Sequence, residues 1–509
     1  MMIKVILLVI FFAVMVAVGI YSRKHAMSVD GFVLGGRSVG PWLTAFAYGT
    51  SYFSAVVFVG YAGQFGWKYG LASTWIGIGN AVIGSLMAWV VLGRRTKVMT
   101  QYLNSKTMPD FFGSRYGSKP LKIAASAIVF VFLVPYTASI YNGLSRLFEM
   151  AFHIPYAWCV IGMAVFTGIY VILGGYMATA INDFIQGIIM LVGIIVVIAA
   201  VLNGQGGFLE AVGKMAEIPS DVEITLGQPG AFTSFFGPDP GNLLGVVILT
   251  SLGTWGLPQM IGKFYAIKDE KSINTGTVIS TVFAIVVSGG CYFLGGFARL
   301  FDAPAIYDEA GAVVYDSIIP HMLSALPDIL IGIVVVLVLS ASMSTLASLV
   351  LTSSSTLTLD FLKDNLLKEM SEKRQVRTMQ VLVIFFIAVS VFIALDPPTF
   401  IAQLMGISWG AVAGAFLAPF LYGLYWKGTT RAGVWASFIV GVGITVVNMF
   451  MPFIESSINA GAAAMLAGLI VVPVVSLITP KLSREKTDAI FSCYEEKVTI
   501  TKKRSLEQN

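Results

Sequence analysis

A helical stretch, Ser340-Ala341-Ser342-Met343-Ser344-Thr345-Leu346-Ala347-Ser348, carries the oxygen atoms with the clearest chemical potential in this sequence. Three hydroxyl groups, those of Ser344, Thr345 and Ser348, follow Ala341 at i+3, i+4 and i+7, so they share one helix face. Hydroxyl and carbonyl oxygens are ligands that a hard cation accepts. Ser and Thr also serve as small packing residues between membrane helices. The stretch therefore predicts either a cation site or a close helix contact.

The composition is that of a polytopic membrane protein. Of the 509 residues, 57% are hydrophobic and 12% are charged, and the mean hydropathy is +0.83. Soluble domains carry a charged share of roughly 25%. The three cysteines and three histidines are scattered along the chain, so we expect neither a disulfide framework nor a metal cluster. Nothing in the sequence favours a nucleic-acid partner.

Hydropathy predicts an all-α protein with about thirteen transmembrane helices in the lipid bilayer. The first, about residues 3–21, is read as an uncleaved anchor because Arg23, Lys24 and His25 follow it. Alternate threading then places most basic residues in the loops on one side, which we expect to be the cytoplasm. This predicts a multi-pass plasma-membrane protein with its N-terminus outside and its C-terminus cytoplasmic. The oligomeric state stays open.

Two spans are predicted to be broken, one at residues 47–54 and the other at residues 250–259. Glycine, proline and hydroxyl residues interrupt the aliphatic runs there, and unwound backbone in a membrane survives beside a cavity or ligand. Each break falls in the first span of a block of five. An odd number of spans inverts the second block, so the pattern predicts a five-plus-five inverted repeat. The expected segments are an extra helix at 1–25, the first repeat at 38–202, an extracellular loop at 203–240, the second repeat at 241–425, two further helices at 432–479 and a cytoplasmic tail at 480–509.

Asp183 is an acidic residue in an apolar span, close to its predicted cytoplasmic end. An acid at that place is either an interfacial residue favoured by the helix dipole or part of a cation exit route. No Lys, Arg, Asp or Glu is expected beside either break. A carboxylate solute would therefore depend on half-helix N-termini and hydroxyls. Tyr48, Tyr52, Tyr136 and Tyr141 could supply apolar walls with polar tips.

Several segments together resemble the sodium:solute symporter family, which includes carriers of proline, pantothenate, sialic acid, glucose, iodide and monocarboxylates. They are Leu34-Gly35-Gly36-Arg37-Ser38, Gly174-Gly175-Tyr176 leading to Asn182-Asp183 and Gln186, Trp255-Gly256, and Ser342-Met343-Ser344-Thr345. The resemblance implies a leucine-transporter-type fold and sodium-coupled import of a small organic solute, without enzymatic activity.

The resemblance also implies a set of site residues. A sodium site would use Thr50, Phe53, Ala341, Ser344 and Thr345. Asp183 and Ser348 match part of a second sodium site or exit route, although Ala347 stands where a hydroxyl is usual. The residues expected to bind the solute are Ser51, Tyr52, Ser54, Tyr136, Trp255 and Gly256.

The predicted solute is a carboxylate such as pantothenate or a monocarboxylate. Proline carriers of the family have an Asp where Tyr52 stands, whereas Lys68-Tyr69-Gly70 and Trp255-Gly256-Leu257-Pro258 look more like the pantothenate and monocarboxylate carriers. The alternatives are a proline, amino-acid or sugar symporter and a proton-coupled permease that uses Asp183. A passive channel is a further class. A membrane enzyme is not expected, because no nucleophile with its base and no phosphate loop is readable.

Overall fold

The computed structural model describes residues 2–363, 366–367 and 369–495. In that part of the chain, ten helices are long and apolar enough to cross a membrane, or eleven if the bent pair Pro240–Gly256 and Pro258–Ala266 counts as one span. Residues 496–509, the end of the predicted cytoplasmic tail, lie outside the described residues.

Two of these helical segments are too long for one crossing. Val56–Tyr102 has 47 residues and Tyr156–Gly204 has 49. At about 1.5 Å per residue each would span roughly 70 Å, more than twice a hydrocarbon core of about 30 Å. Gly70 and Gly175 interrupt them, with φ of 60° and 54°. Counting each segment as two crossings turns eleven into the thirteen that the sequence predicts.

The helices fall into the predicted groups. The N-terminal helix is α1 (Met2–Ser22). The first five crossings are α3 (Pro41–Tyr52) with η3 (Val56–Tyr61) and α4 (Ala62–Tyr69), α5 (Thr74–Gly79) through η5 (Asn80–Met87) and η6 (Trp89–Gly93) to α6 (Arg94–Tyr102), α8 (Lys119–Phe152), and the two halves of α9 (Tyr156–Gly204). The second five are α11 (Pro240–Leu252) with η9 (Gly253–Gly256) and α12 (Pro258–Ala266), α13 (Glu270–Ala284) with α14 (Gly290–Gly295), α16 (Asp328–Thr356), α18 (Glu372–Leu395) and α19 (Ile401–Tyr425). Last come α20 (Arg431–Phe450) and α21 (Ser457–Ile478).

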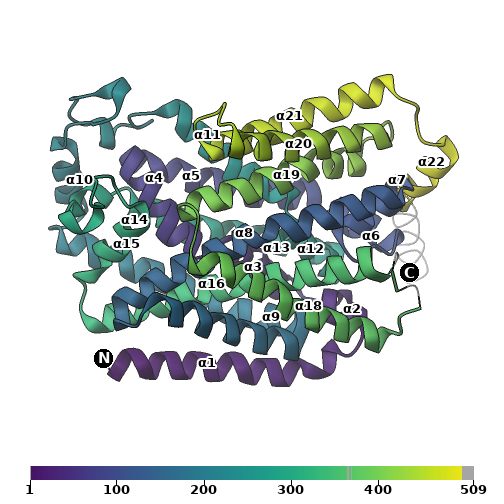
Figure 1. Cartoon of the computed structure of the whole chain (residues 1–509), viewed down its shortest axis with the longest axis horizontal. Coiled ribbons are helices and arrows are strands. Elements are labelled where there is room, and N and C mark those ends of the chain that lie inside the picture. Colours follow the sequence, from purple (N-terminus) through teal and green to yellow (C-terminus); the bar gives the residue numbers. More distant parts are fainter. Residues whose placement is uncertain (1, 364–365, 368, 496–509) are drawn as a thin grey trace, which may run out of the picture.

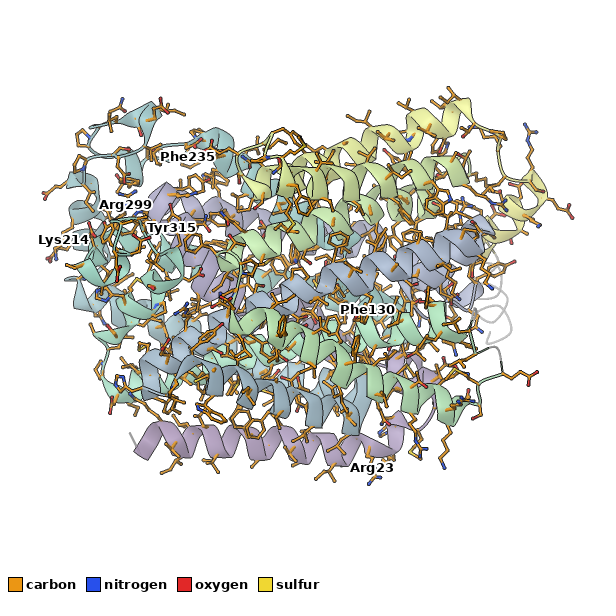
Figure 2. All side chains as sticks on the ribbon, viewed as in Figure 1. Arg23, Phe130, Lys214, Phe235, Arg299 and Tyr315 are labelled. Carbon is orange, nitrogen blue, oxygen red and sulfur yellow. The ribbon has the colours of Figure 1, made fainter. Side chains whose placement is uncertain are left out.

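Short helices cover the two ends of the bundle. The helices α10 (Phe208–Glu217) and α15 (Tyr315–Ser324) lie at the end where α1 begins, and α7 (Met108–Tyr116) and α22 (Arg484–Phe491) lie at the other end (Figure 1). Figure 2 places Lys214, Arg299 and Tyr315 at the α10 end, while Arg23 lies far from them, past the last residue of α1. The two ends of the described chain are therefore on opposite sides, as an odd number of crossings requires.

Burial divides the helices into a centre and a periphery. The spans that contain α16 and α19 are 78% and 89% buried, whereas α1 is 22% buried. A helix that is apolar all round is stable only where other helices surround it. The helix α16 packs on α9, α8 and α3. This arrangement brings the hydroxyl stretch of α16 against the first break.

Both predicted breaks are confirmed. The helix α3 ends at Tyr52, Phe53 is extended (φ −100°, ψ 121°), and η3 begins at Val56. In the second repeat a 3₁₀ turn follows α11, Leu257 is extended (φ −90°, ψ 120°), and Pro258 opens α12 at a bend of 44°. Proline suits the first turn of a helix because it has no N–H to leave unpaired there. The two repeats thus unwind in the same way at corresponding places.

Candidate ion and solute site

Five oxygen atoms converge where the first broken helix meets α16. The Thr345 hydroxyl lies 3.0 Å from the carbonyl oxygen of Thr50 and 3.1 Å from those of Phe53 and Ala341. The Ser344 hydroxyl lies 3.1 Å from the Thr50 oxygen and 3.0 Å from the Ala341 oxygen. All five residues are at most 1% exposed. The structure therefore brings together every residue of the predicted sodium site.

The five-oxygen cluster has more acceptors than donors. Its two hydroxyl groups supply two protons, whereas three carbonyl oxygens, each with two lone pairs, face them. Buried carbonyl groups need partners, and the break in α3 removes the regular partners that a continuous helix would give to Thr50 and Phe53. A bound cation would satisfy all five oxygens together.

The spacing of the cluster suits a hard monovalent cation. Na⁺ has nearly the radius of Ca²⁺, which holds oxygen ligands at about 2.3–2.6 Å, so neighbouring ligands at right angles would lie about 3.3–3.7 Å apart. The oxygens of the cluster lie 3.0–3.1 Å apart, so a shift of roughly 0.5 Å admits such an ion. None of the five ligands is a carboxylate. A neutral ligand set favours a monovalent ion, because divalent cations gain affinity from charged ligands.

Other hydroxyls of α16 hold both sides of the break. The Ser342 hydroxyl accepts a hydrogen bond of 3.2 Å from the backbone N–H of Ala55, just before η3. The Ser348 and Ser51 hydroxyls lie 2.8 Å apart. The α16 helix thus contacts the chain before and after Phe53, and an ion between them would tighten the same contact. The sequence showed Ser342 as part of a motif but gave no sign of this capping role.

An aromatic group lies on the other side of the break. The rings of Tyr52 and Tyr136 each contact Trp409 of α19, with centroids 5.8 Å and 5.9 Å apart. The Tyr136 hydroxyl and the Trp409 indole N–H are buried and make no well-formed hydrogen bond within the described residues. Both groups can donate to a solute oxygen. Sequence analysis missed Trp409, and the only signal was an aromatic residue between serine and glycine in an apolar span.

The remaining predicted solute residues lie close by but have protein partners. The Ser54 hydroxyl accepts from the N–H of Val56 in its own turn. The Trp255 indole donates to the carbonyl of Ile83 at 3.0 Å. A Cβ built on Gly256 would lie 2.8 Å from the Cα of Ala413, so this glycine permits the close approach of α19. Whether these three residues contact the solute stays a prediction.

The predicted pair Asp183 and Ser348 is joined by a lysine. The ammonium of Lys263 on α12 donates to the Ser348 hydroxyl at 3.0 Å and lies 3.8 Å from the Asp183 carboxylate. Lys263 is 2% exposed. The expectation that no charged residue lies beside a break is therefore wrong. Helix α12 starts at the second break, and its second turn carries the long Lys263 side chain back toward Ser348 and Ser51 at the first break.

A polar cavity of about 670 Å³ opens at the α10 and α15 end of the bundle. Its lining includes Gln64 and Lys68 of α4, Asn242 of α11, Tyr315 of α15 and Gln403 of α19. The ammonium of Lys68 lies over the ring of Tyr315, 5.3 Å from its centroid. The cavity therefore reaches both broken helices from one side of the protein.

A model of the sodium:solute symporter family matches residues 32–441. The chain belongs to the sodium:solute symporter family. Among curated relatives, the sodium/proline symporters of Staphylococcus aureus strains JH9 and NCTC 8325 are each 30% identical to this symporter over 500 residues, covering 94% of this chain and 93% of theirs.

Solved structures show the same fold for this symporter. A substrate-bound, outward-open sodium-coupled sialic acid symporter matches with a TM-score of 0.74 at 13% identity, covering 95% of this chain and 99% of the other. A nucleobase-cation-symport-1 family transporter in a closed conformation matches with a TM-score of 0.51 at 14% identity, covering 91% and 98%. The all-helical architecture with an inverted repeat and two broken helices, predicted from the sequence, is thereby confirmed.

Proposed function

We propose that this symporter imports a small organic carboxylate, such as pantothenate or a monocarboxylate, driven by sodium bound at the five-oxygen cluster. The observation that carries the proposal is the convergence of three backbone carbonyls and two hydroxyls on one buried point between α3 and α16. A neutral oxygen set of this kind has no role in helix packing that requires an excess of acceptors.

Sodium and solute are coupled through the first break. An ion that binds Thr50, Phe53 and α16 at once holds the unwound segment in one conformation. The same segment carries Ser51 and Tyr52, which face the proposed solute site. Sodium thus stabilises the form of the protein that binds solute, and by linkage the solute strengthens sodium binding to the same extent.

The donors at the proposed solute site support a carboxylate. The Tyr136 hydroxyl and the Trp409 N–H have no good acceptor in the protein, so an oxygen-rich solute fits them. Tyr52 also turns its hydroxyl toward the carbonyl of Thr250, 3.3 Å away, on the second broken helix. A solute between Tyr52, Tyr136 and Trp409 would therefore touch both repeats.

The direction of import follows from the proposed orientation. Basic residues are concentrated in loops on one side of the predicted threading, which is expected to face the cytoplasm. The N-terminus and the cavity of about 670 Å³ then face outward, and the solute enters from the α10 and α15 end. The protein would act in the plasma membrane.

A panel of radiolabelled solutes in proteoliposomes tests the proposal. Pantothenate, lactate, propionate, proline and glucose are each offered with an inward sodium gradient, with choline in place of sodium, and with an inward proton gradient alone. We expect concentrative uptake of a carboxylate with sodium only. Uptake of proline alone, as the names of the relatives suggest, would contradict the solute class but not the coupling. Uptake driven by protons without sodium would refute the coupling.

A further inference from the structure

Lys263 occupies the place where a second cation would bind. Its ammonium donates to Ser348, lies 3.8 Å from Asp183 and lies 5.1 Å from the centre of the Tyr176 ring. These contacts come from α16 and from the second half of α9, while Lys263 itself belongs to α12. The ammonium thus meets a carboxylate, a hydroxyl and an aromatic face, the groups that attract a cation.

Asp183 needs this positive charge. The residue is completely buried, and neither of its carboxylate oxygens accepts a hydrogen bond within the described part of the chain. A buried carboxylate without hydrogen bonds is costly unless a cation stands near it. Within the described residues, Lys263 is the basic group paired with Asp183. The pair is electrically neutral as it stands.

Ser348 has little capacity left for an additional ion. Its hydroxyl already accepts from Lys263 and shares a hydrogen bond with Ser51. The neighbouring position, Ala347, offers no hydroxyl. A sodium ion beside Asp183 would therefore have to displace the ammonium, or lie next to it and be repelled.

We infer that Lys263 acts as a tethered cation between Asp183 and Ser348, so that the protein binds one sodium ion, at the five-oxygen cluster, and no second one. The inference rests on the proposed function, because it assumes that the five-oxygen cluster takes sodium. The tethered ammonium cannot leave with the solute. One charge from sodium, rather than two, would then move in each transport cycle.

Saturation binding of ²²Na⁺ to the purified protein tests the inference without a known solute. The parent should bind one ion per chain. Lys263→Ala frees the space beside Asp183 and should bind two. The double variant Lys263→Ala/Asp183→Asn should bind one again, because no carboxylate remains to attract the second ion. Lys268→Ala is the matched control, since Lys268 is an exposed lysine outside the cluster, and it should bind one.

The outcomes separate this inference from the proposed function. Two ions on the parent, or one ion on both the parent and Lys263→Ala, would overturn the tethered cation alone. No ion on the parent would refute the sodium site and the inference together. Adding Thr345→Ala should remove the single ion of the parent but leave one on Lys263→Ala. If Lys263→Ala does not yield a monodisperse protein, Lys263→Met keeps the length of the side chain, and the same counts apply.

Discussion

Replacing Thr345 with alanine is the sharpest test of the five-oxygen cluster. The change removes one of five ligand oxygens, and it removes the hydroxyl that lies within 3.1 Å of all three carbonyls. Ser344 reaches only Thr50 and Ala341, so the Phe53 carbonyl would lose its hydroxyl partner. Sodium would then bind the unwound segment less tightly on the side of Phe53, where that segment turns toward η3.

The expected size of the effect follows from the coupling between sodium and solute. Coupling free energies are typically about 1–3 kcal/mol, which corresponds to roughly 5-fold to 150-fold in affinity. We expect Thr345→Ala to need that much more sodium for half-maximal uptake and, at fixed sodium, to show a raised apparent KM for the solute. The assay is the initial rate of uptake into proteoliposomes over a range of sodium concentrations.

Two control variants separate ligation from packing. Thr345→Ser keeps the oxygen and loses one methyl group, so its sodium dependence should stay close to that of the parent. Ser354→Ala removes another buried hydroxyl of α16, which bonds to the carbonyl of Leu351 in its own helix, and should also have little effect. The cluster would be refuted as a sodium site if Thr345→Ala matched the parent, or if Thr345→Ser were impaired as strongly as Thr345→Ala.

Three further predictions concern stability and topology. Burial raises the pKa of Asp316, on α15, to about 6; the folded state therefore binds its proton more tightly than the unfolded chain and should lose stability as the pH rises from about 4 to 6, and Asp316→Asn should flatten that part of a melting-temperature profile. Gly256→Ala should lower the melting temperature through overpacking against α19, by about 1–3 kcal/mol, whereas Gly262→Ala, with open space around its Cβ, should not; equal melting temperatures would contradict the close helix approach. Lys486→Cys on exposed α22 should label with an impermeant maleimide only after cells are permeabilised, because the three native cysteines are buried; labelling of intact cells would reverse the proposed orientation.

The sequence alone determined the class of fold. Long apolar runs can satisfy their backbone in a membrane only as helices, so their number and length follow directly from hydropathy. The two interrupted spans were also readable, because Gly49, Gly253 and Pro258 sit in runs that are otherwise aliphatic. The hydroxyl face of α16 followed from the helical period. Local chemistry decides all of these features, so one sequence is enough.

Tertiary structure decided which groups meet. Residues 50–53 lie almost 300 positions before Thr345 in the chain, and the resemblance rather than any spacing paired them before the structure was known. Nothing local distinguished Trp409, or showed that Lys263 would turn toward Asp183, 80 positions earlier. The physical reason is that a buried charge or an open carbonyl is tolerated only when helices from distant parts of the sequence supply its partner. That partner is set by how the two repeats pack together.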